Sequence, residues 1–199
     1  MKYPSKNVHG QFPIEPAELA HKLNDKRWSN SRTRHFPETQ ELFEFLQSLG
    51  TAQRKQLKSK VVTAKGIGSA SFFFLDKKKR RKAFLLDFLW WKEGWGTLLA
   101  AESELSATDK GSLIHDFEKL LCWKSPLKLM IAREASKVSA EQISKELGEY
   151  ARRWVPQCAK GECYVLFVFG TKENGNSAYA YVAPKDGARD FRFERMSLD

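Results

Sequence analysis

Three acidic residues stand out because of the apolar strands in which they occur. Asp87 interrupts the apolar run at 84–91, and Glu102 and Glu104 follow the apolar run at 97–101. Carboxylates in such strands are costly to bury unless a cation neutralises them. Carboxylate oxygens are also the ligands that Mg²⁺ and other hard cations prefer. The sequence therefore predicts a divalent-metal site and the hydrolytic chemistry that such an ion supports.

Whether the three carboxylates converge depends on the register of a β-hairpin. Glu102 and Glu104 are two residues apart in one strand, so both point to one face, about 7 Å apart. If Glu93-Gly94 forms a two-residue turn, Asp87 lies opposite Ala100 and on the face of both glutamates. A turn one residue longer would move Asp87 to the other face. In the alternative interpretation, the acids lie at strand ends and meet solvent or Lys/Arg partners.

The elements that must position these residues alternate between helices and strands. Helices are expected at 42–50, 113–121 and 139–154, the last opened by the capping pair Ser139 and Gln142. Strands are expected at 61–63, 71–75, 84–91, 97–105, 127–132, 163–169 and 178–183, with Asn174-Gly175 as the last hairpin turn. Strands that are apolar on both faces indicate a sheet covered by helices on each side, which predicts an α/β fold.

A break in pattern near Pro37 suggests the domain organisation. Residues 1–37 are rich in proline and lack a sustained period, so we expect an N-terminal arm or cap with at most a short helix at 16–24. Residues 38–199 are expected to form a single domain, because a chain of 199 residues suffices for one well-packed core.

The charge balance favours a polyanionic partner. The chain has 34 Lys and Arg against 24 Asp and Glu, a formal net charge of +10, and phosphate binding draws affinity from such an excess. A hairpin loop of consecutive basic residues is the expected contact with nucleic acid: Lys77, Lys78, Lys79, Arg80, Arg81 and Lys82. A solvated loop tip explains the same residues equally well.

Three features that the sequence lacks bear on the expected compartment: a membrane-spanning segment, a signal peptide and a disulfide framework. No segment approaches the roughly 20 apolar residues that span a bilayer, and residues 1–12 lack the apolar core of a signal peptide. The three cysteines do not have the spacing of a disulfide framework. We therefore expect a cytoplasmic protein without a membrane partner.

Taken together, the acids and the order of elements resemble the PD-(D/E)xK, or restriction-endonuclease-like, nuclease superfamily over roughly residues 38–132. Asp87 is similar to the Asp of that motif and Glu102 to its first Glu. Two positions differ, since Leu86 replaces the Pro and Glu104 stands where Lys is usual. The resemblance implies a three-layer core, with a central mixed sheet flanked by helices, and a Mg²⁺- or Mn²⁺-dependent endonuclease acting on DNA rather than RNA.

The resemblance also implies roles for individual residues. Asp87, Glu102 and the Ser103 carbonyl would hold the ion, and Glu104 would bind a second ion or orient the attacking water. Lys119, on the following helix, is the candidate replacement for the missing Lys, although its helical position predicts that it points away from the stripe of Leu113, Phe117 and Leu120. Glu41, on the first helix, is a further candidate metal ligand. A homodimer is expected by analogy with restriction enzymes.

Two other interpretations remain open at this point. The chain could be a nuclease-like fold that lost catalysis with the motif Lys and serves as a nucleic-acid-binding or assembly subunit. It could also be a basic α/β protein unrelated to nucleases, whose acidic residues are surface groups. Binding of Mn²⁺ would separate the first from the second.

Overall fold

One mixed β-sheet organises the chain. The computed structural model describes residues 12–28, 36–57, 60–63, 86–92, 96–106, 110–135, 138–153, 158, 160–184 and 190–198. Within these ranges seven strands pair in the order β1-β2-β3-β4-β5-β6-β7. The strands are β1 (Lys60–Thr63), β2 (Phe88–Lys92), β3 (Gly96–Glu104), β4 (Leu127–Arg133), β5 (Cys163–Phe169), β6 (Ser177–Val182) and β7 (Glu194–Met196). The expected α/β class is confirmed.

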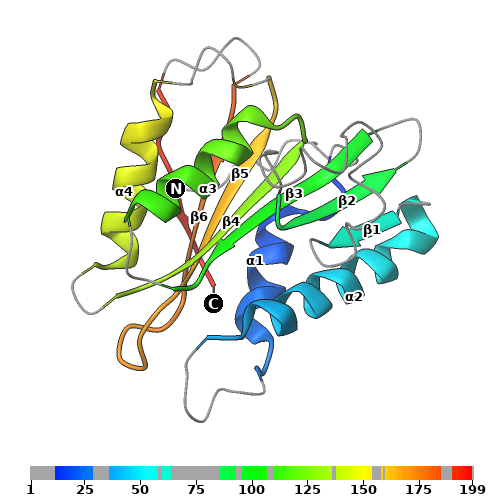
Figure 1. Cartoon of the computed structure of the whole chain (residues 1–199), viewed down its shortest axis with the longest axis horizontal. Coiled ribbons are helices and arrows are strands. Elements are labelled where there is room, and N and C mark those ends of the chain that lie inside the picture. The colour runs from blue at the N-terminus through cyan, green and yellow to red at the C-terminus, as the bar shows by residue number, and fades with distance from the viewer. Residues whose placement is uncertain are drawn as a thin grey trace, which may run out of the picture.

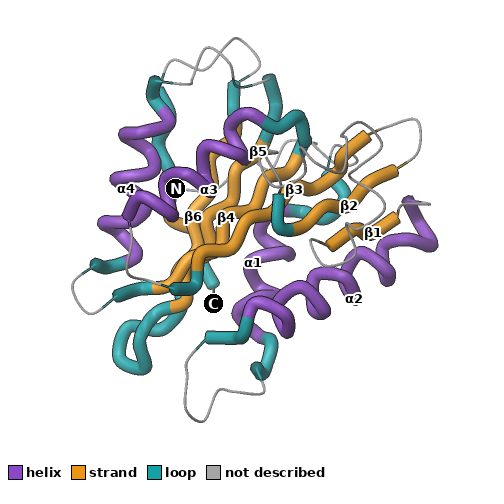
Figure 2. The backbone as a smooth tube through the Cα atoms, viewed as in Figure 1, coloured by secondary structure: helices purple, strands orange, loops and turns teal. Residues whose placement is uncertain are grey.

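Helices cover both faces of the sheet, as the doubly apolar strands predict (Figure 1). They are α1 (Pro16–Asp25), α2 (Thr39–Leu57), α3 (Lys110–Cys122) and α4 (Ala140–Ala151). One apolar core lies between the sheet and the pair α1 and α2, and a second lies between the sheet and the pair α3 and α4. Figure 2 shows the strands as a continuous layer between these helices. None of the helices in the described ranges is long and apolar enough to cross a membrane.

The strand directions bring the acidic residues to one edge of the sheet. β1, β2 and β3 are antiparallel, whereas β3, β4 and β5 run parallel. The helices α3 and α4 form the two crossovers, because parallel neighbours need a long connection. Glu102 and Glu104 therefore lie at the carboxyl end of β3, beside the carboxyl ends of β4 and β5.

The β2–β3 register differs from the expected one, but the face is the same. Phe88 pairs with Ala101, which brings Asp87 abreast of Glu102 instead of Ala100. The pairing shifts between Trp90 and Trp91, where β3 holds one extra residue. A connection longer than the expected two-residue turn shifts the register once, and the bulge shifts it again in the same direction. Because side chains alternate with a period of two, these two shifts together restore the original face.

Several other expectations can be compared with the structure. The Ser139 hydroxyl caps α4 by accepting a hydrogen bond from Gln142 N at 3.3 Å, and Gly175 in the last hairpin has a φ of 66°; both are confirmed. The helix expected to end at Gly50 continues to Leu57, since residues 51–57 are mostly good helix formers. The strand expected at 71–75 lies outside the described residues. β7 was not expected.

The amino-terminal segment contributes to the main core. The helix expected at 16–24 is present as α1, and Leu19, Ala20 and Leu23 on it are fully buried. They belong to the core beneath the sheet, together with Leu42 and Leu46 of α2. This part of the expected arm is therefore integrated with the domain that carries the acidic residues.

Candidate metal centre

Asp87 and Glu102 are fixed by reciprocal hydrogen bonds between the start of β2 and the end of β3. The Ser103 backbone N–H donates to Asp87 Oδ2 at 3.0 Å, and the Ser103 hydroxyl donates to the same oxygen at 3.3 Å. In return, the Asp87 backbone N–H donates to Glu102 Oε1 at 3.2 Å. Asp87 thus extends the β2–β3 pairing through its side chain, and the two carboxylates are held beside each other.

Lys119 completes this site from α3. Its Nζ lies 2.7 Å from Glu102 Oε2 and 2.8 Å from Asp116 Oδ1. Lys119 does lie away from the apolar stripe of α3, but the inference that it would therefore not point inward was wrong for a tertiary reason. Phe117, on the apolar stripe of α3, packs sideways against Tyr164 of β5 and against Phe191. The opposite side of the helix, which carries Lys119, therefore faces Glu102.

The burial of these groups changes their acidity. Glu102 is fully buried, and this burial, together with the neighbouring Asp87 charge, raises the pKa of Glu102 from 4.5 to about 9 despite its contact with Lys119. Burial also raises the pKa of Asp87, although hydrogen bonds from Ser103 oppose the change. Burial lowers the pKa of Lys119, but its bonds to Asp116 and Glu102 outweigh that effect and raise it overall. Lys119 is therefore an ammonium at neutral pH.

The charges at this site do not cancel among the described residues. Three carboxylates (Asp87, Glu102 and Asp116) face one ammonium (Lys119), so the fully ionised group would carry a net charge of −2. A divalent cation would offset that charge. Asp87 and Glu102 supply hard oxygen donors suited to Mg²⁺. Across the described ranges, no three or more His, Cys, Asp or Glu side chains lie where they could hold one metal ion, so among these residues a third protein ligand would be a backbone carbonyl.

The other expected site residues are placed differently. Glu104 accepts hydrogen bonds from the Ser106 backbone N–H at 2.8 Å and from the Ser106 hydroxyl, so its carboxylate turns into the loop after β3. Glu41 lies in the first turn of α2, on the helix that covers the opposite face from α3. Their roles as metal ligands or catalytic groups remain predictions. The basic loop of Lys77, Lys78, Lys79, Arg80, Arg81 and Lys82 lies outside the described residues.

A second buried charged cluster, which the sequence reasoning missed, provides a contrast. Lys128 on β4 is 1% exposed, and its Nζ contacts Glu162 Oε2 at 2.7 Å and the Tyr164 hydroxyl at 2.8 Å. Burial lowers the pKa of Lys128, and Glu162 opposes this effect. Here one positive and one negative group match, so this cluster needs no further ion. A lone charged residue in the apolar strand 127–132 was the signal that could have found it.

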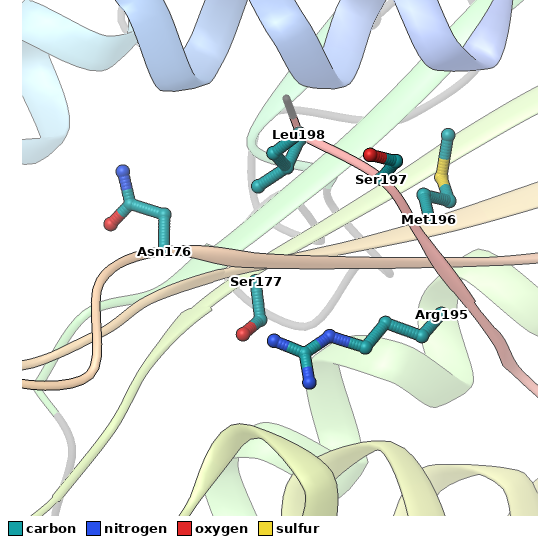
Figure 3. A pocket seen from close by; sticks show the side chains of 6 residues that line it. All are labelled: Asn176, Ser177, Arg195, Met196, Ser197 and Leu198. Carbon is teal, nitrogen blue, oxygen red and sulfur yellow. The ribbon is translucent and has the colours of Figure 1, made fainter.

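Two cavities lined by described residues adjoin the sheet. One of about 390 Å³ lies beside β7 (Figure 3) and is lined by Asn176, Ser177, Arg195, Met196, Ser197 and Leu198. The other, of about 350 Å³, lies between the start of α2 and the end of β3. Ser103, which binds Asp87, lines the second cavity. The second cavity therefore adjoins the candidate metal centre.

Comparison with known proteins does not add to this picture. No protein-family model matches the chain, and neither a curated protein nor a solved structure was found to be similar to it. The function of this protein is accordingly inferred from the geometry and chemistry of the site.

The raised pKa of Glu102 predicts how stability depends on pH. A group whose pKa rises from 4.5 when unfolded to about 9 when folded binds more protons in the folded state between these values. Its stabilising effect is therefore complete below the lower value and is lost as pH rises toward the higher one. Without metal, the free energy of unfolding should fall between about pH 5 and 9, by at most about 1.4 kcal/mol per pH unit for one such group.

Urea unfolding of the metal-free protein across this pH range measures the effect. Glu102→Gln should flatten the slope, whereas the exposed control Glu149→Gln should leave it unchanged. The slope is the appropriate readout. Any fixed cost of placing an amide beside Lys119 changes the free energy of unfolding by the same amount at every pH and leaves the slope unchanged. Equal slopes in the wild type and Glu102→Gln would contradict the assignment.

Proposed function

We propose that this protein is a Mg²⁺- or Mn²⁺-dependent nuclease that hydrolyses phosphodiester bonds of DNA. The observation that carries the proposal is the pairing of half-buried Asp87 with fully buried Glu102, because the two carboxylates, when both are ionised, carry more negative charge than Lys119 neutralises. Such a pair is stable at neutral pH when a divalent cation is bound, and acidic groups with perturbed pKa values are typical of functional sites. The formal charge of +10 supports a polyanionic substrate.

The arrangement of elements also supports a restriction-endonuclease-like core. The chain runs α2, β1, β2, β3, α3 and β4, which is the helix, three-strand, helix and strand order of the motif pattern. Asp87 lies at the start of the second strand and Glu102 near the end of the third. Lys119 on α3 compensates for Glu104 at the position where the motif has Lys.

Each protein group has a distinct role in the proposed reaction. Asp87, Glu102 and the Ser103 carbonyl would hold the ion, with Asp87 oriented by its two hydrogen bonds from Ser103. A bound Mg²⁺ would supply Lewis-acid stabilisation of the phosphate and lower the pKa of the attacking water. Lys119 keeps its proton because Asp116 and Glu102 raise its pKa. It would therefore stabilise negative charge on the phosphate and orient the water, and would not act as a base.

The test combines metal binding with cleavage. Calorimetry should detect binding of Mn²⁺ to the wild-type protein, with protons released near pH 7 because Glu102 is protonated there without metal. Incubation of plasmid DNA and of single-stranded DNA with Mg²⁺ or Mn²⁺ should give cleavage that EDTA abolishes. Cleavage that continues in EDTA would refute the proposal.

The outcomes separate the proposal from its rivals. Binding of Mn²⁺ without cleavage of either DNA would favour a nuclease-like fold that acts as a nucleic-acid-binding subunit. No binding of Mn²⁺ would favour a basic α/β protein whose acidic pair has another role. Sedimentation of the protein with and without DNA would test the expected homodimer.

A further inference from the structure

The cavity beside the candidate metal centre is in the right place to receive part of the substrate. Its lining comes from two segments: Phe36, Pro37, Glu38 and Thr39 before and at the start of α2, and Ser103, Glu104, Leu105 and Ser106 at the end of β3. Ser103 belongs both to this lining and to the hydrogen bonds that hold Asp87. A group next to a phosphate at Asp87 and Glu102 would therefore reach the cavity.

The charge of the lining selects against a second phosphate. Glu38 and Glu104 both line the cavity, and two carboxylates repel an anion. The uncharged groups near a phosphate in nucleic acid are the sugar and the base, and the flat base is the one suited to the aromatic ring of Phe36 in the lining. At about 350 Å³ the cavity is large enough for one base.

An aromatic ring and a fixed carboxylate equip the cavity to bind a base. Phe36 contributes the ring, and the Arg133 guanidinium lies 4.4 Å from its centroid. Arg133 Nη2 also donates to the Ser106 carbonyl at 2.8 Å, so it connects the two segments that line the cavity. Glu104 is held by the Ser106 N–H and hydroxyl. A carboxylate has about four lone-pair positions, so Glu104 can accept further hydrogen bonds while it is held in place.

We propose that this cavity binds the guanine of an unpaired nucleotide next to the cleaved phosphodiester, with Glu104 as the residue that recognises it; this inference rests on the proposed nuclease function. Guanine presents two adjacent donors, N1–H and N2–H. Because Ser106 donates both of its hydrogen bonds to Glu104 Oε1, Oε2 is the oxygen that would accept from guanine. Those donors are engaged in a base pair within a duplex. The substrate would therefore be single-stranded, or would have one nucleotide turned out of the helix.

Binding without metal tests the cavity separately from catalysis. Fluorescence anisotropy in EDTA would use a short labelled oligothymidine with guanine, inosine or adenine at one central position. Inosine keeps N1–H but lacks the amino group. Guanine should bind roughly fivefold to a hundredfold more tightly than inosine or adenine, in the range expected for a bidentate contact to a base.

Matched variants assign the preference to Glu104. Glu104→Gln should reduce the guanine-to-inosine ratio to near one, because the single amide oxygen stays with Ser106 and the NH2 group, a donor, would then face the guanine donors. The exposed control Glu149→Gln should keep the wild-type ratio, and thermal melting would confirm that both variants fold. Equal binding of the three oligonucleotides, no binding of any, or a preference that survives Glu104→Gln would each overturn the proposal.

The two proposals can fail independently. Mg²⁺-dependent cleavage at equal rates with guanine, inosine and adenine would leave the nuclease function standing and reject the guanine cavity. Guanine-dependent binding without cleavage under any metal condition would reject the nuclease function and retain the cavity.

Discussion

Asp87→Asn should reduce metal-dependent DNA cleavage by about a thousandfold or more, which corresponds to losing about 4 kcal/mol of transition-state stabilisation. The asparagine oxygen can still accept the two hydrogen bonds that Ser103 donates to Asp87, so the fold should persist. What is lost is the negative charge that binds the ion. Calorimetry with Mn²⁺ should therefore show weaker binding, alongside the loss of cleavage.

The control for this variant is Asp190→Asn. Asp190 is 64% exposed and pairs with Arg152 at 2.9 Å, so its replacement changes the same charge away from the site. It should cleave at the wild-type rate and melt at nearly the wild-type temperature. If Asp87→Asn cleaves as fast as Asp190→Asn, the proposed metal centre is not the site of catalysis.

Lys119→Met should reduce cleavage by roughly a hundredfold to a thousandfold, the range for losing one group that stabilises charge in the transition state. The methionine keeps most of the apolar stem but removes the ammonium that contacts Glu102 at 2.7 Å. This contact lowers the pKa of Glu102, so in the variant the release of protons on metal binding should extend to higher pH than in the wild type. Lys119→Arg should retain part of the activity.

One measurement with a matched control distinguishes catalysis from a purely structural role of Lys119. Single-turnover rates at saturating Mn²⁺ should remain low in Lys119→Met, although the metal site is filled. The exposed Lys124 provides the matched control, and Lys124→Met should cleave normally. Full recovery of Lys119→Met at high metal concentration would mean that Lys119 only positions Glu102.

The elements were predictable where the signals are local. The cap at Ser139 and the turn at Asn174-Gly175 depend on residues close in sequence, and both are as expected. Gly50 misled the prediction, because a glycine ends a helix only when the residues beyond it cannot continue one. β7 has three residues, which is too short for a periodic pattern.

The candidate site was predictable in part, for reasons that differ between its residues. A charged residue in an apolar stretch indicated Asp87, but the same criterion also selects Lys128, whose charge is matched by Glu162. The structure separates Asp87 from Lys128, because it shows which opposite charges surround each of them. Asp116 was missed, although its spacing of three residues from Lys119 on one helix is a local signal for an ion pair.

By itself, the sequence determined the helices and strands with strong periodicity, the basic character of the chain, and the placement of Glu102 and Glu104 on one side of one strand. Only the tertiary structure decided that Asp87 lies abreast of Glu102, because the connection and the bulge each shift the pairing. It also decided that Lys119 reaches Glu102. A helical pattern shows which side of α3 is apolar, but the direction of that side depends on where α3 packs on the sheet.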